Sequence, residues 1–328
     1  MHKHRRWGYY LVSLFLLNDI VVFLFIEVIL FLLMFISELS VLKVLKSWNF
    51  SATTTKQYSL EKRNYLINTI IYFAVTVKIV MFVFFIKSLD SLSHLVPGAM
   101  CTTGVIGANA YGNVLLLFKI FILFLLGIWI VINKLDLQSK VFPYIREKYY
   151  LFSFIFVLLC IEFVLQILFF TNIPLSVPVF CCSTVFQLDN LPFELDLLGL
   201  MIIFYLLYII ILVSSVFKNN ILSFFANVLF LFTSYYSVTY FFGTYIYEMP
   251  THKCPYCMLQ KEYFYVGYFI WFSLFLGVFF GIAPYVIESI TLKKYDHLYK
   301  YCIYFTSIFV LLCSYYVLVY YIKNGVLL

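Results

Sequence analysis

The chain has 328 residues, of which 64% are hydrophobic and 11% are charged; its mean hydropathy is +1.00 and its formal net charge is +7. This composition excludes an ordinary soluble domain. The basic residues are separated by long apolar runs and do not form the dense basic face that nucleic-acid binding needs. We therefore expect the lipid bilayer, and not nucleic acid, to be the partner that the composition describes.

Eight apolar stretches are long enough to cross the hydrocarbon core of a bilayer, which takes about 20 mostly apolar residues in a helix. They cover residues 9–37, 65–88, 113–132, 149–171, 196–217, 221–247, 263–287 and 301–322. None shows the alternation of polar and apolar residues that a membrane barrel requires. The sequence predicts an all-α, polytopic membrane bundle of about eight transmembrane helices. We divide it into an N-terminal helix with a cytoplasmic loop (1–64) and a seven-helix membrane domain (65–328).

The distribution of lysine and arginine predicts the orientation of these helices. Basic residues collect in alternate loops, which the positive-inside rule places in the cytoplasm; they are Lys43, Lys46, Lys56, Lys62, Arg63, Lys134, Lys140, Arg146, Lys148, Lys218, Lys293, Lys294 and Lys300. The opposite loops and the C-terminus hold fewer: Lys87, Lys253, Lys261 and Lys323. The basic tail at 1–6 favours the reverse orientation, but the loops outweigh it. We expect a multi-pass protein of the cell inner membrane.

Four charged residues fall inside the predicted spans: Glu27, Lys78, Lys119 and Glu162, with Gln166 one turn after Glu162. Charges inside a bilayer are costly unless they are paired. The first interpretation is that these two acids and two bases form buried pairs that orient the helices. The alternative is a proton path or a polar pocket for a cofactor head group, in which Glu162 and Lys119 would be the cofactor-binding or proton-handling residues.

The pattern Pro-x-x-x-Cys recurs where the chain leaves the bilayer on the outer side. It is formed by Pro97 and Cys101, by Pro178 and Cys182, and by Pro250 and Cys254. Proline cannot continue a helix interior, so each motif ends a span with a stiff turn. The motifs are about one helical hairpin apart, which indicates an internal repeat of three consecutive hairpins. In such a repeat the thiols of Cys101, Cys182 and Cys254 are expected to converge on one outer pocket.

The cysteines of the predicted outer loops are Cys101, Cys181, Cys182, Cys254 and Cys257. They face a compartment that permits disulfides, so one possibility is that they only staple the loops. Against this, the vicinal pair at 181 and 182 is an awkward staple, and Cys-x-x-Cys at a helix start is an arrangement that makes thiols reactive. We expect the N-terminus of the seventh span to stabilise a thiolate at Cys257.

Three further cysteines, Cys160, Cys302 and Cys313, lie within the spans. Cysteine surrounded by apolar side chains behaves as a small hydrophobic residue, and we expect these three thiols to be inert. In the predicted seventh span, Gly277 and Gly281 form a small-x-x-x-small pattern, which allows close approach of neighbouring helices.

The run Cys254-Pro-Tyr-Cys257-Met-Leu-Gln260-Lys261 resembles the Cys-x-x-Cys-x-x-Gln-Arg stretch of the bacterial quinone-coupled disulfide-bond oxidoreductases. The resemblance implies that Cys254 and Cys257 pass electrons to a bound quinone, with Gln260 and Lys261 beside it, although lysine replaces arginine. That family has four spans, and its second cysteine pair follows the first. Here the other outer cysteines precede Cys254, an order that is similar to the vitamin K epoxide reductase family.

In this scheme Cys101, with Cys181 or Cys182, exchanges with a substrate or a thioredoxin-like thiol protein. Metal handling is the rival class, because methionine and histidine flank the outer thiols, and cysteine with methionine suits copper(I). The flanking residues are Met100, Met249, Met258, His94 and His252. The sequence therefore predicts a membrane thiol-disulfide oxidoreductase that uses a quinone. Copper binding or transfer, and a structural protein with stapling disulfides, are the alternatives.

Overall fold

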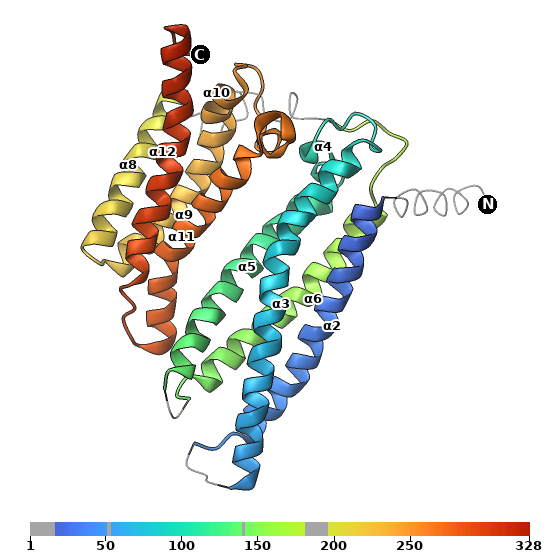
Figure 1. Ribbon diagram of the computed structural model, residues 1–328, viewed down its shortest axis with the longest axis vertical. Helices are drawn as coiled ribbons and strands as arrows, with labels where there is room; N and C mark the ends of the chain where they lie inside the picture. Colours follow the sequence, from blue (N-terminus) through green and yellow to red (C-terminus); the bar gives the residue numbers. More distant parts are fainter. Residues whose placement is uncertain (1–16, 51–53, 140–141, 181–195) are drawn as a thin grey trace, which may run out of the picture. The chain divides into compact units, whose positions relative to one another are not determined.

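The computed structural model describes residues 17–50, 54–139, 142–180 and 196–328, and within these residues all regular structure is helical (Figure 1). Eight helices are long and apolar enough to cross a membrane. The prediction of an all-α, polytopic membrane bundle is therefore confirmed, and the chain is a multi-pass membrane protein. The helical spans are Asn18–Ser47, Thr55–Ser93, Ala110–Leu137, Ile145–Thr171, Leu197–Val216, Asn220–Tyr247, Val266–Thr291 and Leu298–Asn324.

The chain divides into two compact units, residues 1–179 and 180–328. Unit 1 contains the helices α2 (Asn18–Ser47), α3 (Thr55–Ser93), α4 (Thr102–Ile106), α5 (Ala110–Leu137) and α6 (Ile145–Thr171). Helix α2 packs against α3 and α6, and α5 packs against α3 and α6 (Figure 1). The predicted boundary between residues 64 and 65 falls within α3, which packs on α2 along one side and on α5 along another.

Unit 2 contains α8 (Leu197–Val216), α9 (Asn220–Ser237), the π-helix η3 (Val238–Phe242), α10 (Gly243–Tyr247), the short 3₁₀-helices η4 (Cys257–Leu259) and η5 (Lys261–Tyr263), α11 (Val266–Thr291) and α12 (Leu298–Asn324). Helix α9 packs on α8 and α11, and α12 packs on α8 and α11. The core of unit 2 contains four phenylalanines, one each from α8, α9, η3 and α12. The Phe204 ring centroid lies 5.3 Å from that of Phe230, 5.2 Å from Phe242 and 6.0 Å from Phe309.

Polar side chains cap the N-termini of several helices, where backbone amides need a hydrogen-bond acceptor. The Thr54 hydroxyl accepts a hydrogen bond from Gln57 N at 3.4 Å, and Asn109 Oδ1 accepts one from Tyr111 N at 3.0 Å. Asp196 Oδ1 caps α8 in the same way through Gly199 N at 2.9 Å. Such caps satisfy amides that have no partner within the first helical turn. They explain why each helix begins at these residues.

The connection predicted as a cytoplasmic loop at residues 38–64 is largely helical. Helix α2 continues to Ser47 and α3 already begins at Thr55. For this polar connection the sequence allows either a loop or a surface helix, and the structure shows helix over most of it, because its polar residues lie on helical turns that extend the spans. At 1.5 Å per residue, the 39 residues of α3 reach about 58 Å, well beyond the ~30 Å hydrocarbon core of a bilayer.

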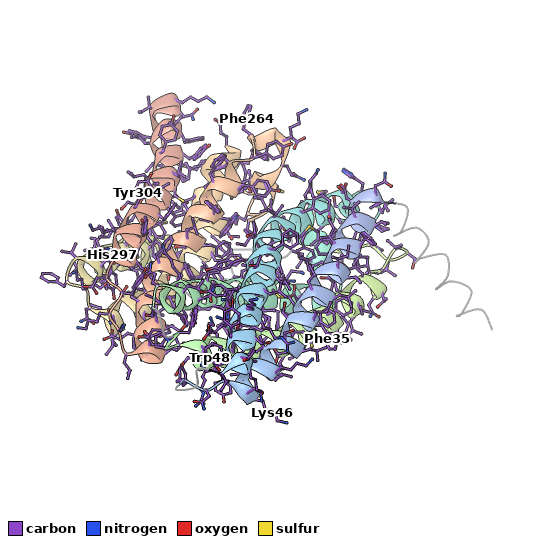
Figure 2. All side chains as sticks on the ribbon, turned by 60° about the horizontal axis from the view of Figure 1, so that its bottom comes forward. Phe35, Lys46, Trp48, Phe264, His297 and Tyr304 are labelled. Atoms are coloured by element: carbon purple, nitrogen blue, oxygen red, sulfur yellow. The ribbon has the colours of Figure 1, made fainter. Side chains whose placement is uncertain are left out.

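Both units carry large apolar side chains on their outer surfaces, as lipid-facing helices do. Phe35 on α2 is 44% exposed and Tyr304 on α12 is 60% exposed (Figure 2). Inside unit 2, an ideal Cβ on Gly277 would lie 2.6 Å from Thr306 Cγ2, and one on Gly281 would lie 2.1 Å from Asn227 Nδ2. The predicted close helix approach at these glycines is confirmed: α11 meets α12 at the first and α9 at the second.

Candidate functional site

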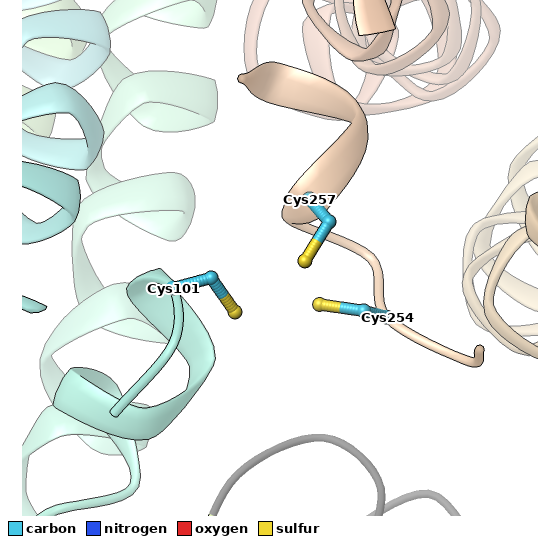
Figure 3. Close-up of side chains that lie close together, drawn as sticks. All are labelled: Cys101, Cys254 and Cys257. Carbon is cyan, nitrogen blue, oxygen red and sulfur yellow. The ribbon is translucent and has the colours of Figure 1, made fainter. Parts of the chain in front are cut away.

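The Cys-x-x-Cys motif lies in unit 2, on the connection between α10 and α11. Helix α10 ends at Tyr247, and Glu248 then takes a left-handed conformation with φ 53° that turns the chain away from the helix axis. Cys254 follows in the loop, and Cys257 opens η4. The two Sγ atoms lie within 4.8 Å of each other, and the side chains reach toward one another (Figure 3). A small movement would bring them to disulfide distance.

Two aromatic side chains of unit 2 hold this loop in place. The Tyr247 hydroxyl donates a hydrogen bond to Cys254 O and accepts one from Met258 N at 3.0 Å, so one phenol joins both sides of the motif. Trp271 of α11 donates from Nε1 to Pro255 O at 3.1 Å. The motif is therefore fixed to α10 and α11 through its backbone, and both of its cysteines are buried. Nothing in the sequence pattern marks Tyr247 or Trp271 for this role.

Gly267 in the first turn of α11 brings that helix close to η4. An ideal Cβ at this position would lie 2.5 Å from Met258 Cγ and 2.9 Å from the Met258 backbone carbon, distances that any real Cβ avoids. Met258 is fully buried against this surface. Gly267 thus allows α11 to pack closely against Met258, the residue that follows Cys257.

The seventh span begins later in the chain than the hydropathy pattern indicates. Helix α11 begins at Val266, so η5 and two left-handed residues, Phe264 and Tyr265, lie between η4 and the helix. The first turn of α11 nevertheless packs on Met258, the residue after Cys257, and stabilisation of a Cys257 thiolate by this helix N-terminus stays a prediction. The aromatic and polar residues of the connection lengthen the loop beyond what the hydropathy pattern indicates.

The residues predicted to lie beside the quinone, Gln260 and Lys261, follow shortly after Cys257 in the chain. The Gln260 backbone amide donates to Cys257 O at 3.0 Å, and the Lys261 side chain is exposed. Nearby, partial burial raises the pKa of the Tyr263 phenol, and negative charge on Cys257, Glu262 and Cys254 would raise that pKa further. Tyr263 is therefore a protonated hydrogen-bond donor at neutral pH.

The methionines and histidines that favour a metal site belong partly to unit 1 and partly to unit 2. The His252 ring lies edge-on to Tyr247, with centroids 4.5 Å apart, and its Nε2 is buried without a hydrogen-bond partner. Met249 is 44% exposed, and Met100 and His94 belong to unit 1. Within unit 2, the described residues bring only two thiols, Cys254 and Cys257, within 4.8 Å of each other.

The first Pro-x-x-x-Cys motif ends α3 in unit 1, and Cys101 is the N-cap of α4. Val179 N donates a hydrogen bond to Pro97 O at 2.9 Å, and Gly98, with φ +81°, leaves room for the Val179 carbonyl. The Val-Pro turns of the first two motifs are therefore in direct contact. Cys181 and Cys182 lie outside the described residues, and the expected convergence of Cys101, Cys182 and Cys254 stays a prediction.

The internal repeat of three hairpins also stays a prediction. Helices α3 and α5 pack together in unit 1, and α9 and α11 pack together in unit 2. The second motif, at residues 178–182, lies where one unit ends and the other begins, so the helices α6 and α8 that flank it belong to different units.

The four intramembrane charges meet in the interior of unit 1. Lys78 Nζ lies 2.9 Å from Glu27 Oε2 and 3.0 Å from Glu162 Oε1, and Lys119 Nζ lies 2.6 Å from Glu162 Oε1. Lys119 also donates to Gln166 Oε1 at 2.9 Å. The prediction that these acids and bases form buried pairs is confirmed. Each of α2, α3, α5 and α6 contributes one charge, so this charge cluster joins all four long helices of the unit.

A small cavity adjoins the charge cluster. Its volume is about 10 Å³, and Glu27, Lys78 and Glu162 line it together with apolar side chains. Both lysines contact Glu162 Oε1, whereas the buried Glu162 Oε2 has no partner. The space fits about one water molecule. It is too small for a cofactor head group to enter between these residues.

Sequence reasoning missed a second buried ion pair in unit 1. Lys148 Nζ lies 2.5 Å from Asp136 Oδ2, and both side chains are fully buried. Asn133 Oδ1 accepts a further hydrogen bond from Lys148 at 3.0 Å. The sequence assigns Lys148 to a cytoplasmic loop because it precedes an apolar run. Lys148 lies at the start of one span and Asp136 at the end of the previous one. Opposite charges at adjoining span ends could have predicted this ion pair.

The cysteines of the spans occupy the environments that were expected. Cys302 and Cys313 on α12 are fully buried, and Cys160 on α6 is partly buried. The Cys302 thiol lies 3.7 Å from Asn227 Oδ1 and 3.8 Å from Ser215 Oγ, contacts that connect α12 to α9 and α8. These are packing positions between helices.

Comparison with known proteins supplies no relative from which a role could be transferred. No family model matches the chain, and no curated protein or solved structure is significantly similar to it. The function of the Cys254–Cys257 motif is therefore inferred from its own residues and geometry.

Proposed function

We propose that this protein is an integral membrane thiol-disulfide oxidoreductase of the cell inner membrane that passes electrons from thiols at the outer face to a membrane quinone. The proposal rests on one observation: Cys254 and Cys257 place their sulfurs within 4.8 Å in a loop that Tyr247 and Trp271 hold by its backbone. A loop with two adjacent thiols that is already held through its backbone favours reversible disulfide chemistry over a permanent staple, because Tyr247 and Trp271 fix the loop without a disulfide.

The exchange step transfers two electrons. The pair formed by Cys101 with Cys181 or Cys182 first takes two electrons from the substrate by thiol-disulfide exchange, which leaves a substrate disulfide and a reduced pair. A thiolate of that reduced pair then attacks the Cys254–Cys257 disulfide, a mixed disulfide forms, and the second thiol of the pair resolves it, which leaves the pair oxidised and Cys254–Cys257 as a dithiol. Reoxidation of the dithiol releases two electrons and two protons. A quinone supplies the acceptor for both, and Gln260 and Lys261, which follow Cys257 directly, are the residues of this chain that would bind its ring oxygens.

Cys101, with Cys181 or Cys182, is assigned the exchange with the substrate or with a thioredoxin-like partner. The hydrogen bond between Val179 N and Pro97 O supports this assignment, since it ties together the turns that precede these cysteines in the chain. Glu162 and Lys119 are less suited to binding a quinone ring. Their charged atoms contact each other and their neighbours, and the adjoining cavity holds about one water molecule.

The test is quinone reduction by the purified full-length protein, followed by absorbance, with a reduced thioredoxin-like protein as the electron donor. We expect Cys254→Ser and Cys257→Ser each to abolish turnover. Cys160→Ser, which alters a partly buried thiol on α6, is expected to keep it. Equal turnover by all three variants and the wild-type protein would refute the proposal.

Soft-metal binding is the second candidate, and the same sulfur pair favours it. Two sulfurs that share an ion at bond lengths of about 2.3 Å are at most about 4.6 Å apart, and the two Sγ atoms here lie within 4.8 Å of each other. His252 Nε2, buried without a hydrogen-bond partner, is a further available donor. Copper(I) titration separates the candidates: stoichiometric, tight binding without quinone turnover would assign the motif to copper binding or transfer.

A differential alkylation map distinguishes both candidates from a purely structural role. A structural staple stays oxidised under mild reductant, whereas an exchanging pair becomes alkylated at Cys254 and Cys257 after brief reduction. Full protection of both thiols under these conditions would indicate a stapling disulfide.

A further inference from the structure

We propose that the groove between α11 and α12 is a binding site for one anionic phospholipid, with an acyl chain lying on its aromatic wall and the phosphate at Lys300. The groove has a volume of about 510 Å³ and is lined by Leu276, Phe280, Lys300, Tyr301, Tyr304 and Phe305. The accessible lining atoms are apolar, so Lys300 borders the groove with the methylene groups of its side chain and its ammonium lies at the mouth. The groove lies wholly within unit 2 and shares no residue with the thiol site.

The wall of the groove is built by packed rings that leave a fixed apolar surface. The Phe280 ring of α11 stacks on Phe305 of α12 with centroids 5.8 Å apart, and it also contacts Tyr301 at 5.2 Å. Tyr304 and Tyr301 remain 60% and 52% exposed, and Tyr304 is labelled in Figure 2. A wall of this kind offers an acyl chain more contact than the smooth side of a single helix does, since dispersion attraction grows with the number of atom contacts.

The polarity of the groove changes along its length. Lys300 lies in the first turn of α12, where unpaired backbone amides also carry partial positive charge, and the apolar residues follow farther along the helix. A phospholipid has the same order: a charged phosphate at the membrane surface and hydrocarbon below it. Basic pockets between helices at the cytoplasmic surface recognise anionic head groups in this way.

The charges around Lys300 leave it available for a phosphate. Asp296, the nearest acid in the chain, forms an ion pair with Lys218 at 2.8 Å. Across the described ranges of the chain, no carboxylate lies within ion-pair distance of Lys300. Lys294, in the preceding loop, adds exposed positive charge at the same end of the unit.

Native mass spectrometry of the detergent-solubilised full-length protein tests the site, with dioleoyl phosphatidylglycerol and dioleoyl phosphatidylcholine as probes. We expect preferential retention of one phosphatidylglycerol. Lys300→Gln is expected to lower that retention about 5-fold, the effect of one lysine at a membrane surface, and Lys300→Arg to preserve it. Lys134→Gln, an exposed lysine on α5 in unit 1, is the matched control and should have no effect.

A second pair of variants tests the apolar wall. Tyr304→Ala is expected to weaken retention of dioleoyl phosphatidylglycerol severalfold and to leave a short-chain phosphatidylglycerol unaffected. Phe269→Ala, which removes a 67% exposed ring from α11 outside the groove, is the control. Equal retention of the two head groups, an equal loss in Lys134→Gln, or a wild-type result for Tyr304→Ala would each overturn the proposal. A Tyr304→Ala protein that changes its subunit number instead would assign the groove to a second copy of the chain.

Discussion

Lys119 Nζ lies 2.6 Å from Glu162 Oε1 in the interior of unit 1, where both side chains are nearly inaccessible to solvent. The Lys119 ammonium also lies 5.2 Å and 5.0 Å from the ring centroids of Phe23 and Phe85, which adds a cation–π contribution. With Glu27 and Lys78, the pair makes a charge cluster that joins four helices. Charged groups at this depth are tolerated only with their partners, so the cluster specifies how the helices are arranged.

Glu162→Gln is expected to destabilise unit 1 strongly. The change removes one of the two carboxylates that Lys78 and Lys119 share and leaves excess positive charge in the interior, and removing one partner of a buried pair costs about 3–5 kcal/mol. Denaturant unfolding in detergent, followed by circular dichroism, measures the loss. Glu147→Gln makes the same chemical change at an exposed position on α6 and should cost less than about 1 kcal/mol. Equal free energies of unfolding for the two variants would contradict this account.

Lys148→Met should be much less stable than Lys134→Met. Lys148 is fully buried on Asp136, so its removal leaves a carboxylate uncompensated in the interior, at about 3–5 kcal/mol. Lys134 is exposed near the end of α5, and its loss should change stability by less than about 0.5 kcal/mol. Thermal unfolding of the purified variants provides the comparison. If Lys148→Met unfolds at the wild-type temperature, the buried pair has no structural role.

Tyr247→Phe is expected to loosen the Cys254–Cys257 loop while keeping its aromatic packing. The variant removes the hydroxyl that contacts Cys254 O and Met258 N, at a cost of about 1–3 kcal/mol for the buried backbone groups. Alkylation of the two thiols should become faster, as measured by mass-tagging of intact protein over time. Tyr245→Phe, in the same short helix, removes a hydroxyl that donates to Leu328 O at 3.5 Å, outside the thiol loop, and serves as the control. Identical alkylation rates for wild-type and Tyr247→Phe proteins would rule out the positioning role.

Gly267→Ala should displace η4 from α11. The added methyl would overlap the backbone and side chain of Met258, and such overpacking costs about 1–3 kcal/mol. We expect a smaller fraction of Cys254–Cys257 disulfide at a given redox potential, read by gel shift after alkylation. At Gly107 an added Cβ meets only Thr103 O at 3.2 Å, so Gly107→Ala should have a mild effect. A disulfide fraction unchanged by Gly267→Ala would mean that η4 adapts without cost.

The sequence by itself determined the membrane class, the number of spans and the existence of paired charges within them. These follow from hydrophobic length and from the cost of a lone charge in hydrocarbon, which are properties of local composition. The Cys-x-x-Cys motif was likewise visible as a pattern. Its candidate partners Gln260 and Lys261 came from resemblance to other proteins and remain predictions.

Only the tertiary structure decided which residues meet. It gave Lys78 and Lys119 the same two carboxylate partners, Glu27 and Glu162, buried Lys148 on Asp136, and joined Tyr247 to both sides of the thiol motif. It also showed that α11 begins only at Val266, and that the first turn of this helix packs on Met258. Hydropathy reports the environment of a segment but carries no information on the rotation of one helix against another. That rotation is set by packing between helices, which decides the partners.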